Sequence, residues 1–280
     1  IVGGGGGGGY SGLRSSSSQP NRLGGGGGGA GGLIYTQDST DFKAGETYTI
    51  TVGQGGLGGQ ANIDLPASSV SNADFVQDGK DSTIIHAGSS LNLTAKGGGS
   101  GTNRSQTDNG IGRSGGSGGG SKEVNINNVA KGTSGQGHDG GIGRSNHSGG
   151  GGGGAGGEAK VPKTTHVGNA QSGHSEWGGD GGDGRRINID GMNNAYAAGG
   201  GGGGNGHWGQ GQSLGGGPWE VYPSAHIHPT RGKMRGLGGS SASPAFVSSA
   251  WVDDGVDPIQ HAMQNTGSGG AGGGCYYNGE

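Results

Sequence analysis

The sequence predicts an irregular, mostly β fold built around a bundle of polyglycine II (polyproline II-like) helices, with short β-strands, long loops and almost no α-helix. Two observations carry this prediction. Glycine fills 81 of 280 positions and stands in contiguous runs, where about 7% glycine is usual. Between the runs, short stretches alternate β-branched and polar residues. Only 26% of the residues are hydrophobic, so backbone hydrogen bonds must replace much of a conventional core.

The nine-residue run GGGGGGAGG occurs twice without change, at 24–32 and 149–157. Glycine runs have no side chains to bury, and composition alone favours flexible linkers. Threefold polyglycine II helices are the ordered alternative, because they bond sideways to one another when no Cβ separates them. At 3.1 Å per residue, six to nine residues span roughly 19–28 Å. The other glycine-dominated runs are 3–9, 53–59, 97–101, 115–120, 178–184, 199–204, 215–217 and 267–274.

The clearest strand signal is the stretch 43–52 (KAGETYTITV), in which Tyr48, Ile50 and Val52 alternate with threonines. This alternation is typical of a half-buried strand. The stretch 82–95 predicts two short strands joined by a Gly-Ser-Ser turn. Weaker patterns predict strands at 123–129 and 185–190 and a short helix at 257–264.

Charge, cysteine content and hydropathy exclude several classes of protein. The net charge is −3 and no basic tract is present, so we expect no nucleic-acid partner. Cys275 is the single cysteine, which rules out an intramolecular disulfide and a cysteine-based zinc site. No stretch approaches about 20 apolar residues, so we expect no membrane insertion. We treat residues 1–280 as one glycine-rich domain, open to being a segment of a longer chain.

Motifs that resemble catalytic sites are frequent by chance at this glycine content, and those that resemble metal sites have simpler interpretations. The stretch 112–116 (GRSGG) matches G-x-S-x-G, but no helix signal follows it, and we predict no enzyme and no cofactor. The stretch 178–186 resembles one calcium-binding nonapeptide, but such repeats work in tandem, and we expect a solvated turn. His226 and His228, with His207 or His261 as a third ligand, could hold a metal, but surface histidines are the default. Three glycosylation triplets begin at Asn92, Asn103 and Asn146.

Large side chains are rare and gather near glycine-rich loops, chiefly in an insert at 219–263. They have two interpretations: apolar plugs at the ends of the bundle, or a receptor-binding surface of aromatic rings. The candidate receptor-binding residues are Trp208, Trp219, Tyr222, His226, His228, Trp251, Tyr276 and Tyr277.

Several of these runs together carry a resemblance. The GGGGGGAGG run, the strand AGETYTITVGQGG at 44–56 and the ending NTGSGGAGGG resemble the glycine-rich domain of bacteriophage tail-fibre and tail-tip proteins. The resemblance implies a polyglycine II sandwich, similar to that of the T-even distal adhesins, whose connecting loops touch a bacterial receptor. The long insert with tryptophan and histidine departs from those adhesins.

From this resemblance we expect a virion tail domain, extracellular, that presents loops to a host cell-surface receptor, either a protein or a glycan. Other virion fibre proteins are expected partners, and a homo-oligomer stays open. The alternative is an extracellular filament or matrix subunit that assembles through polyglycine layers. A third class, the glycine-rich extracellular region of certain animal receptor tyrosine kinases, would require cysteine-rich modules that this sequence lacks.

Overall fold

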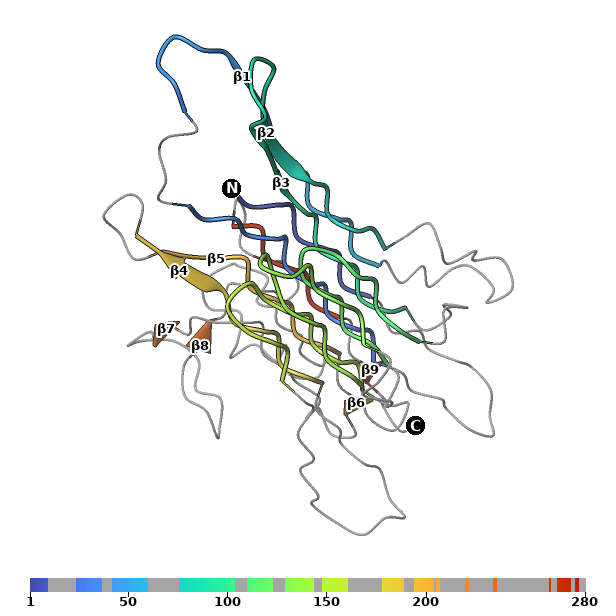
Figure 1. The fold of residues 1–280 in the computed structure, drawn as a ribbon. Coiled ribbons are helices and arrows are strands. Elements are labelled where there is room, and N and C mark those ends of the chain that lie inside the picture. Colours follow the sequence, from blue (N-terminus) through green and yellow to red (C-terminus); the bar gives the residue numbers. More distant parts are fainter. Residues whose placement is uncertain are drawn as a thin grey trace, which may run out of the picture.

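The computed structural model describes residues 1–9, 24–36, 42–59, 76–103, 110–122, 129–143, 148–160, 178–188, 194–203, 205–206, 220–221, 234–235, 262, 266–272 and 275–276. Within these residues it contains short strands and long extended tracts and no helix, as predicted (Figure 1). The predicted strand at 123–129 and helix at 257–264 fall almost entirely outside the described residues. In the part of the chain that is described, no helix could cross a membrane.

The strands form one sheet and three pairs. β1 (Tyr48–Thr51), β2 (Ser82–His86) and β3 (Asn92–Ala95) make an antiparallel sheet in that order. β4 (Arg185–Ile187) pairs antiparallel with β5 (Asn194–Tyr196), and β7 (Glu220–Val221) with β8 (Met234–Arg235). β6 (Asn205–Gly206) and β9 (Cys275–Tyr276) are parallel. The sequence therefore predicted β1 within 43–52, and both strands of 82–95.

The tract 24–32 is the centre of the bundle, because its backbone is bonded to six described segments. Its N–H groups donate to three of them, and every third residue donates to the same one. The donor sets and their neighbours are Gly26, Gly29 and Gly32 with segment 96–102, Gly27 and Ala30 with 150–153, and Gly28 and Gly31 with 267–270.

The carbonyl groups of the same tract follow the same period. They accept from three further segments, 3–9, 117–120 and 200–203. In this tract, three successive residues bond to three different neighbours, and the fourth residue bonds to the same neighbour as the first. This pattern is that of a threefold helix without internal hydrogen bonds, which is polyglycine II. Parallel and antiparallel neighbours are mixed, so chain direction is not what selects the partners. The predicted polyglycine II bundle is confirmed.

The need for glycine in the tracts comes from the missing Cβ and not from unusual backbone angles. Positive φ occurs at four described glycines, Gly45, Gly110, Gly135 and Gly267, of which only the last belongs to a long tract and begins it. Inside the bundle, a Cβ built on almost any tract glycine would collide with a backbone carbonyl of a neighbouring tract. The Cα–H bonds therefore point at carbonyl oxygens, the geometry of weak C–H···O hydrogen bonds.

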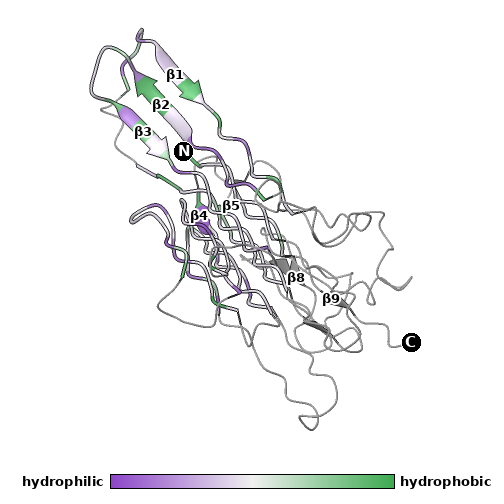
Figure 2. Cartoon of the chain, turned by 90° about the vertical axis from the view of Figure 1, so that its right-hand side faces the viewer, coloured by the Kyte–Doolittle hydropathy of each residue, from purple (hydrophilic) through white to green (hydrophobic). Residues whose placement is uncertain are grey.

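The sheet and the bundle are continuous. After β1 the chain enters tract 53–59, β2 is preceded by 76–80, and β3 is followed by tract 96–103. These three tracts stay neighbours, since Lys80 N–H donates to Gln54 O at 2.8 Å and Gly79 N–H to Gly98 O at 2.9 Å. In Figures 1 and 2 the three strands extend the bundle beyond its end. The chain thus passes directly from β pairing to polyglycine II pairing at the ends of these strands.

A small apolar core lies where the tracts meet this sheet end. Its fully buried residues are Ala30, Leu33 and Ala197, and Val2, Tyr35, Ala155, Ile187 and Tyr196 pack against them. The β4–β5 hairpin contributes the last two residues, so both strand groups lie at the same end of the bundle. β6 comes after tract 199–203 and β9 after segment 267–272, so this strand pair lies at the end of the bundle opposite to the sheet. Backbone hydrogen bonds, with this small plug, hold the fold.

Candidate binding surface at the sheet end of the bundle

The structure leaves the predicted receptor-binding residues untested. Trp208, Trp219, Tyr222, His226, His228, Trp251 and Tyr277 lie outside the described residues. Tyr276 is described only as backbone, in β9, at the bundle end opposite to the β1–β3 sheet (Figure 1). The aromatic insert therefore stays a prediction.

The described structure offers a different surface, one face of the β1–β3 sheet. Register places Tyr48 opposite His86 and Ile50 opposite Ile84, which in turn faces Leu93. Because neighbours in register point to the same side, these residues share one face. Ile50 is 65% exposed, and Val52, which continues the same alternation, is 84% exposed. Figure 2 marks hydrophobic colour on β1 and β2 at this end of the molecule. We call this face the sheet-end face.

An aromatic corner ends the sheet-end face. The ring centroids of Phe42 and Tyr48 are 5.3 Å apart, and those of Tyr48 and His86 are 4.8 Å apart, both in tilted arrangements. Phe42 is 44% exposed, whereas His86 is only 6% exposed. The corner thus has a buried imidazole at its base and an accessible phenyl ring at its rim. Such pairs are worth about 0.5–1.5 kcal/mol beyond the area they bury.

Polar contacts fix the orientation of the corner. His86 Nδ1 lies 2.7 Å from Ser89 Oγ and its Nε2 lies 3.3 Å from Glu46 Oε2. The backbone N–H of Lys43 donates to the hydroxyl oxygen of Tyr48 at 2.7 Å. Both ring nitrogens of the histidine therefore have partners, and the tyrosine ring is held from its far end. A preorganised aromatic surface loses little side-chain entropy when it binds a partner.

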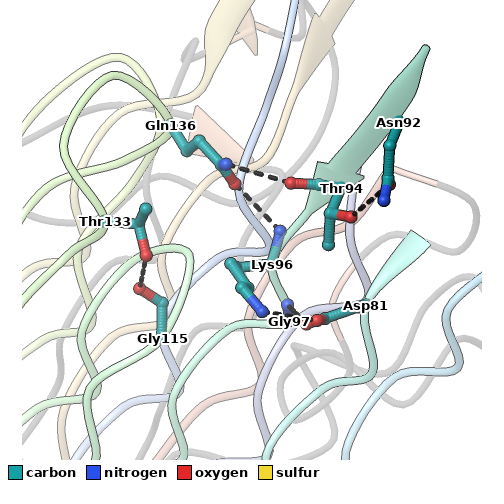
Figure 3. Close-up of polar contacts among 8 residues, drawn as sticks. All are labelled: Asp81, Asn92, Thr94, Lys96, Gly97, Gly115, Thr133 and Gln136. Carbon is teal, nitrogen blue, oxygen red and sulfur yellow. Dashed lines mark hydrogen bonds and ion pairs between the residues drawn. The ribbon is translucent and has the colours of Figure 1, made fainter. Parts of the chain in front are cut away.

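A cluster of polar residues anchors the sheet to the bundle (Figure 3). The Gln136 side chain makes two hydrogen bonds to the backbone at the end of β3: its Oε1 accepts from Lys96 N–H at 2.9 Å and its Nε2 donates to Thr94 O at 3.0 Å. The backbone carbonyl of Gln136 also accepts from Leu33 N–H at 2.9 Å. One residue therefore ties the end of β3 to the central tract and to the apolar core.

Asp81 makes a clasp at the same junction. Its carboxylate accepts from Lys96 Nζ at 2.9 Å and from Gly97 N–H at 2.8 Å (Figure 3). Partial burial disfavours the charged form, but the two hydrogen bonds and the lysine charge outweigh it and hold the pKa of Asp81 below its ordinary value. The carboxylate thus supplies an acceptor to a tract N–H at the point where the tract begins.

The same clasp recurs at a second Lys-Gly pair. Asp139 accepts from Lys131 Nζ at 2.7 Å and from Gly132 N–H at 2.9 Å. Burial again opposes ionisation, while these hydrogen bonds and the charges of Lys131 and His138 lower the pKa of Asp139. Asp78 is related, since it accepts from Ser100 N–H at 2.8 Å and its carboxylate lies 3.5 Å from Arg113 Nη1. Aspartates therefore replace tract carbonyls where the bundle reaches an edge.

The metal-like and glycosylation motifs can be compared with the described residues. Among them, no group of three or more histidine, cysteine or acidic residues could hold a metal ion. The calcium-like stretch 178–186 contributes its first residues to the bundle and its last two to β4. Of the glycosylation triplets, Asn92 is exposed and Asn103 is fully buried, so a glycan at Asn103 is incompatible with the folded chain.

Sequence reasoning missed the sheet-end face although it found the strands. The alternation of Tyr48, Ile50 and Val52 predicted a half-buried strand, but two of the three are largely exposed. An alternating pattern shows that two faces differ and does not show what covers either of them. The signal that could have helped is the short glycine-poor stretch around Phe42, which adds an aromatic ring next to the strand.

These features define a class of protein: a domain held by backbone hydrogen bonds between glycine tracts, with a side-chain surface at its sheet end. The chain matches the family model described as "Glycine-rich domain" over residues 1–280, and it belongs to that family. No curated protein and no solved structure matches it.

Proposed function

We propose that this chain is a virion structural domain, part of a tail fibre or tail tip, that presents surface residues to a host-cell receptor. The observation that carries the proposal is the bonding of tract 24–32 to six segments through backbone groups alone. A scaffold held mainly by backbone hydrogen bonds leaves most side chains on its surface free to vary. Binding residues in many folds lie on such loops, positioned by a rigid support.

Two surfaces are available for the receptor in this proposal. One is the sheet-end face with its aromatic corner, where Phe42 and Ile50 are exposed. The other is the predicted set of tryptophan, tyrosine and histidine residues in and around 219–263. Exposed aromatic rings give a large contact area at a small entropy cost, and both sugars and protein loops bind to them. The receptor is a protein or a glycan on the host surface, and the domain acts outside the cell.

The test is binding of the purified domain to host cells. We expect Ile50→Ser, or else Trp219→Ala and Trp251→Ala, to weaken binding at least tenfold, about 1.4 kcal/mol, without lowering the melting temperature. Phe42→Ser should also weaken binding, with a small loss of stability from the broken Phe42–Tyr48 contact. Thr49→Ala is the matched control, since Thr49 is exposed and lies on the opposite face of β1. A domain that binds no cell surface, or binds equally well in all variants, would refute the proposal.

The second candidate is an extracellular filament or matrix subunit. The open edge of the bundle at 53–59 favours it, because residues there are exposed along a tract that could bond to another chain. Electron microscopy of the purified domain separates the candidates: filaments that grow with concentration support the second, and discrete particles support the first.

A further inference from the structure

A groove on the surface of the bundle is wide enough for one more polyglycine II helix. The groove, of about 960 Å³, runs along tract 3–9, between tract 53–59 and segment 267–272. Its walls are glycine backbone with a few side chains, of which Val52, Gln54 and Leu57 stand on one side. The residues that line it include no charged group. The groove is therefore unsuited to a phosphate or a metal ion and suited to a neutral ligand that makes backbone hydrogen bonds.

The N–H groups of Gly5 and Gly8 indicate that the groove lacks a hydrogen-bond acceptor segment. Tract 3–9 accepts hydrogen bonds from three neighbours and donates to two, segments 26–32 and 77–80. Gly5 and Gly8 belong to the third donor set, one helical repeat apart, and within the described residues their N–H groups have no acceptor. Both residues line the groove and are buried. Tract 3–9 thus has five described neighbours where the central tract has six.

Gly55 and Gly58 give a second, independent observation. At most tract glycines a Cβ would collide with a neighbouring carbonyl, but a Cβ at Gly55 or Gly58 would meet nothing closer than 3.7 or 3.6 Å. Neither residue has a positive φ. The described packing of this chain therefore does not require glycine at either position. Both face space beside the groove, where a closely approaching backbone would require it.

We propose that the groove binds a polyglycine II segment of a second copy of this chain, namely the edge tract 53–59. In this tract the side chains of Gln54 and Leu57 occupy one column of the threefold helix, and the other two columns are glycine. Its outer residues are exposed, in the repeating order expected for a helix bonded on one side only. Tract 53–59 is thus a polyglycine II helix with backbone carbonyl groups that are free within the described part of the chain, which is what the N–H groups of Gly5 and Gly8 need.

The adjacency of tract and groove makes the contact self-complementary. A twofold axis between them sets the tract of each copy into the groove of the other, which is an isologous and closed interface. The amides of Gly5 and Gly8 gain carbonyl acceptors, and the edge tracts gain partners for their outward backbone groups. The contact also covers Val52 and Leu57, which are 84% and 60% exposed. Each copy supplies the sixth neighbour that the other lacks.

The test is the oligomeric state of the full chain by sedimentation equilibrium, up to about 100 µM, a range that populates an interface of ordinary affinity. We expect a monomer–dimer equilibrium that Gly55→Val and Gly58→Val weaken at least tenfold. Gly157→Val is the matched control, because its Cβ also has room, at 3.7 Å from the nearest atom, but lies away from the groove. A monomer at all concentrations, or a dimer insensitive to both groove variants, overturns the proposal.

Amide hydrogen exchange on the unmodified chain removes any dependence on how the variants fold. The N–H groups of Gly5 and Gly8 should become at least tenfold more protected as the concentration rises through the dimerisation range. Those of Gly4 and Gly7, which donate within the chain, should stay protected throughout. Protection of Gly5 and Gly8 in the monomer would mean that another segment of the chain fills the groove, and that result also overturns the proposal.

Discussion

The side-chain oxygen of Gln136 accepts a hydrogen bond from the backbone N–H of Lys96 at 2.9 Å, across 40 residues of sequence. The contact lies where β3 becomes a polyglycine II tract, so it marks the place where one kind of backbone pairing replaces another. Strand partners cannot serve Lys96 N–H there, and a side-chain amide does so instead. The junction therefore depends on the Gln136 side chain together with the Asp81 clasp.

Replacement of Gln136 by alanine should destabilise this junction. The change leaves Lys96 N–H and Thr94 O without their partner, at a cost of about 1–3 kcal/mol. We expect a lower free energy of unfolding in urea and faster hydrogen exchange at Lys96 N–H. Gln136→Glu is the control, because it keeps the acceptor and loses the donor, and should be less harmful. Unchanged exchange at Lys96 would show that the junction is held by other contacts.

A side chain in the middle of the bundle should prevent close approach of the tracts. A Cβ at Gly27 would collide with Gly200 O, and one at Gly152 with Gly28 O. Separation breaks several backbone hydrogen bonds together, so we expect Gly27→Val and Gly152→Val to cost about 3 kcal/mol or more. Gly157→Val should change the melting temperature little, because its Cβ has room. Equal melting temperatures for all three variants would contradict the bundle.

Acid should weaken the fold through the two aspartate clasps. The folded-state pKa values of Asp81 and Asp139 lie below their ordinary value, so both contribute stability that is present above the unfolded pKa of about 3.9. That stability is lost as the pH falls through the folded pKa values. Thermal melts between about pH 2 and 7 should show this decline. The double variant Asp81→Asn, Asp139→Asn should flatten it, and an equally steep decline in that variant would assign the acid sensitivity to other groups.

Core and surface positions near the sheet end should respond differently to substitution. Leu33 is 1% exposed and packs in the apolar core, so Leu33→Ala should cost about 2–4 kcal/mol. Ile50 is 65% exposed, and Ile50→Lys should change the free energy of unfolding by no more than about 0.5 kcal/mol. Urea titrations measure both. A large loss in the Ile50 variant would mean that the sheet-end face is covered in the native protein.

The sequence was sufficient to predict most of the described tracts and the strands β1 to β4, but not the short strands β5 to β9 or the arrangement of the tracts. Polyglycine runs are nearly identical, so no side-chain pattern says that 24–32 bonds to 96–102 and not to 178–184. Segment 77–80 also escaped notice, because an edge position needs glycine only on its inner side and carries Gln77, Asp78 and Lys80. The position of a tract in the bundle decides which residues it tolerates, and the sequence alone does not reveal that position.

The candidate site was predictable to a smaller extent. Aromatic content directed attention to the 219–263 insert, which lies almost wholly outside the described residues and stays a prediction. The aromatic corner brings Phe42 and Tyr48 together with His86, which is distant in sequence. That association follows from the β1–β2 register, and no local pattern encodes it.

The threefold screw of tract 24–32 has a genetic consequence. Advancing such a helix by one residue and turning it by a third restores the same donors and acceptors, so a pure glycine run keeps no record of its own alignment. Ala30 and Leu33, buried in the core, fix it from one end. Replication slippage that adds one glycine codon before Ala30 would then leave the bundle unchanged and lengthen only the connection that precedes it. Loss of a codon would instead bring Leu23 to the place of Gly24, where a Cβ collides with Gly203 O. Related sequences can therefore differ in the length of the loop before a glycine run while the bundle itself stays the same.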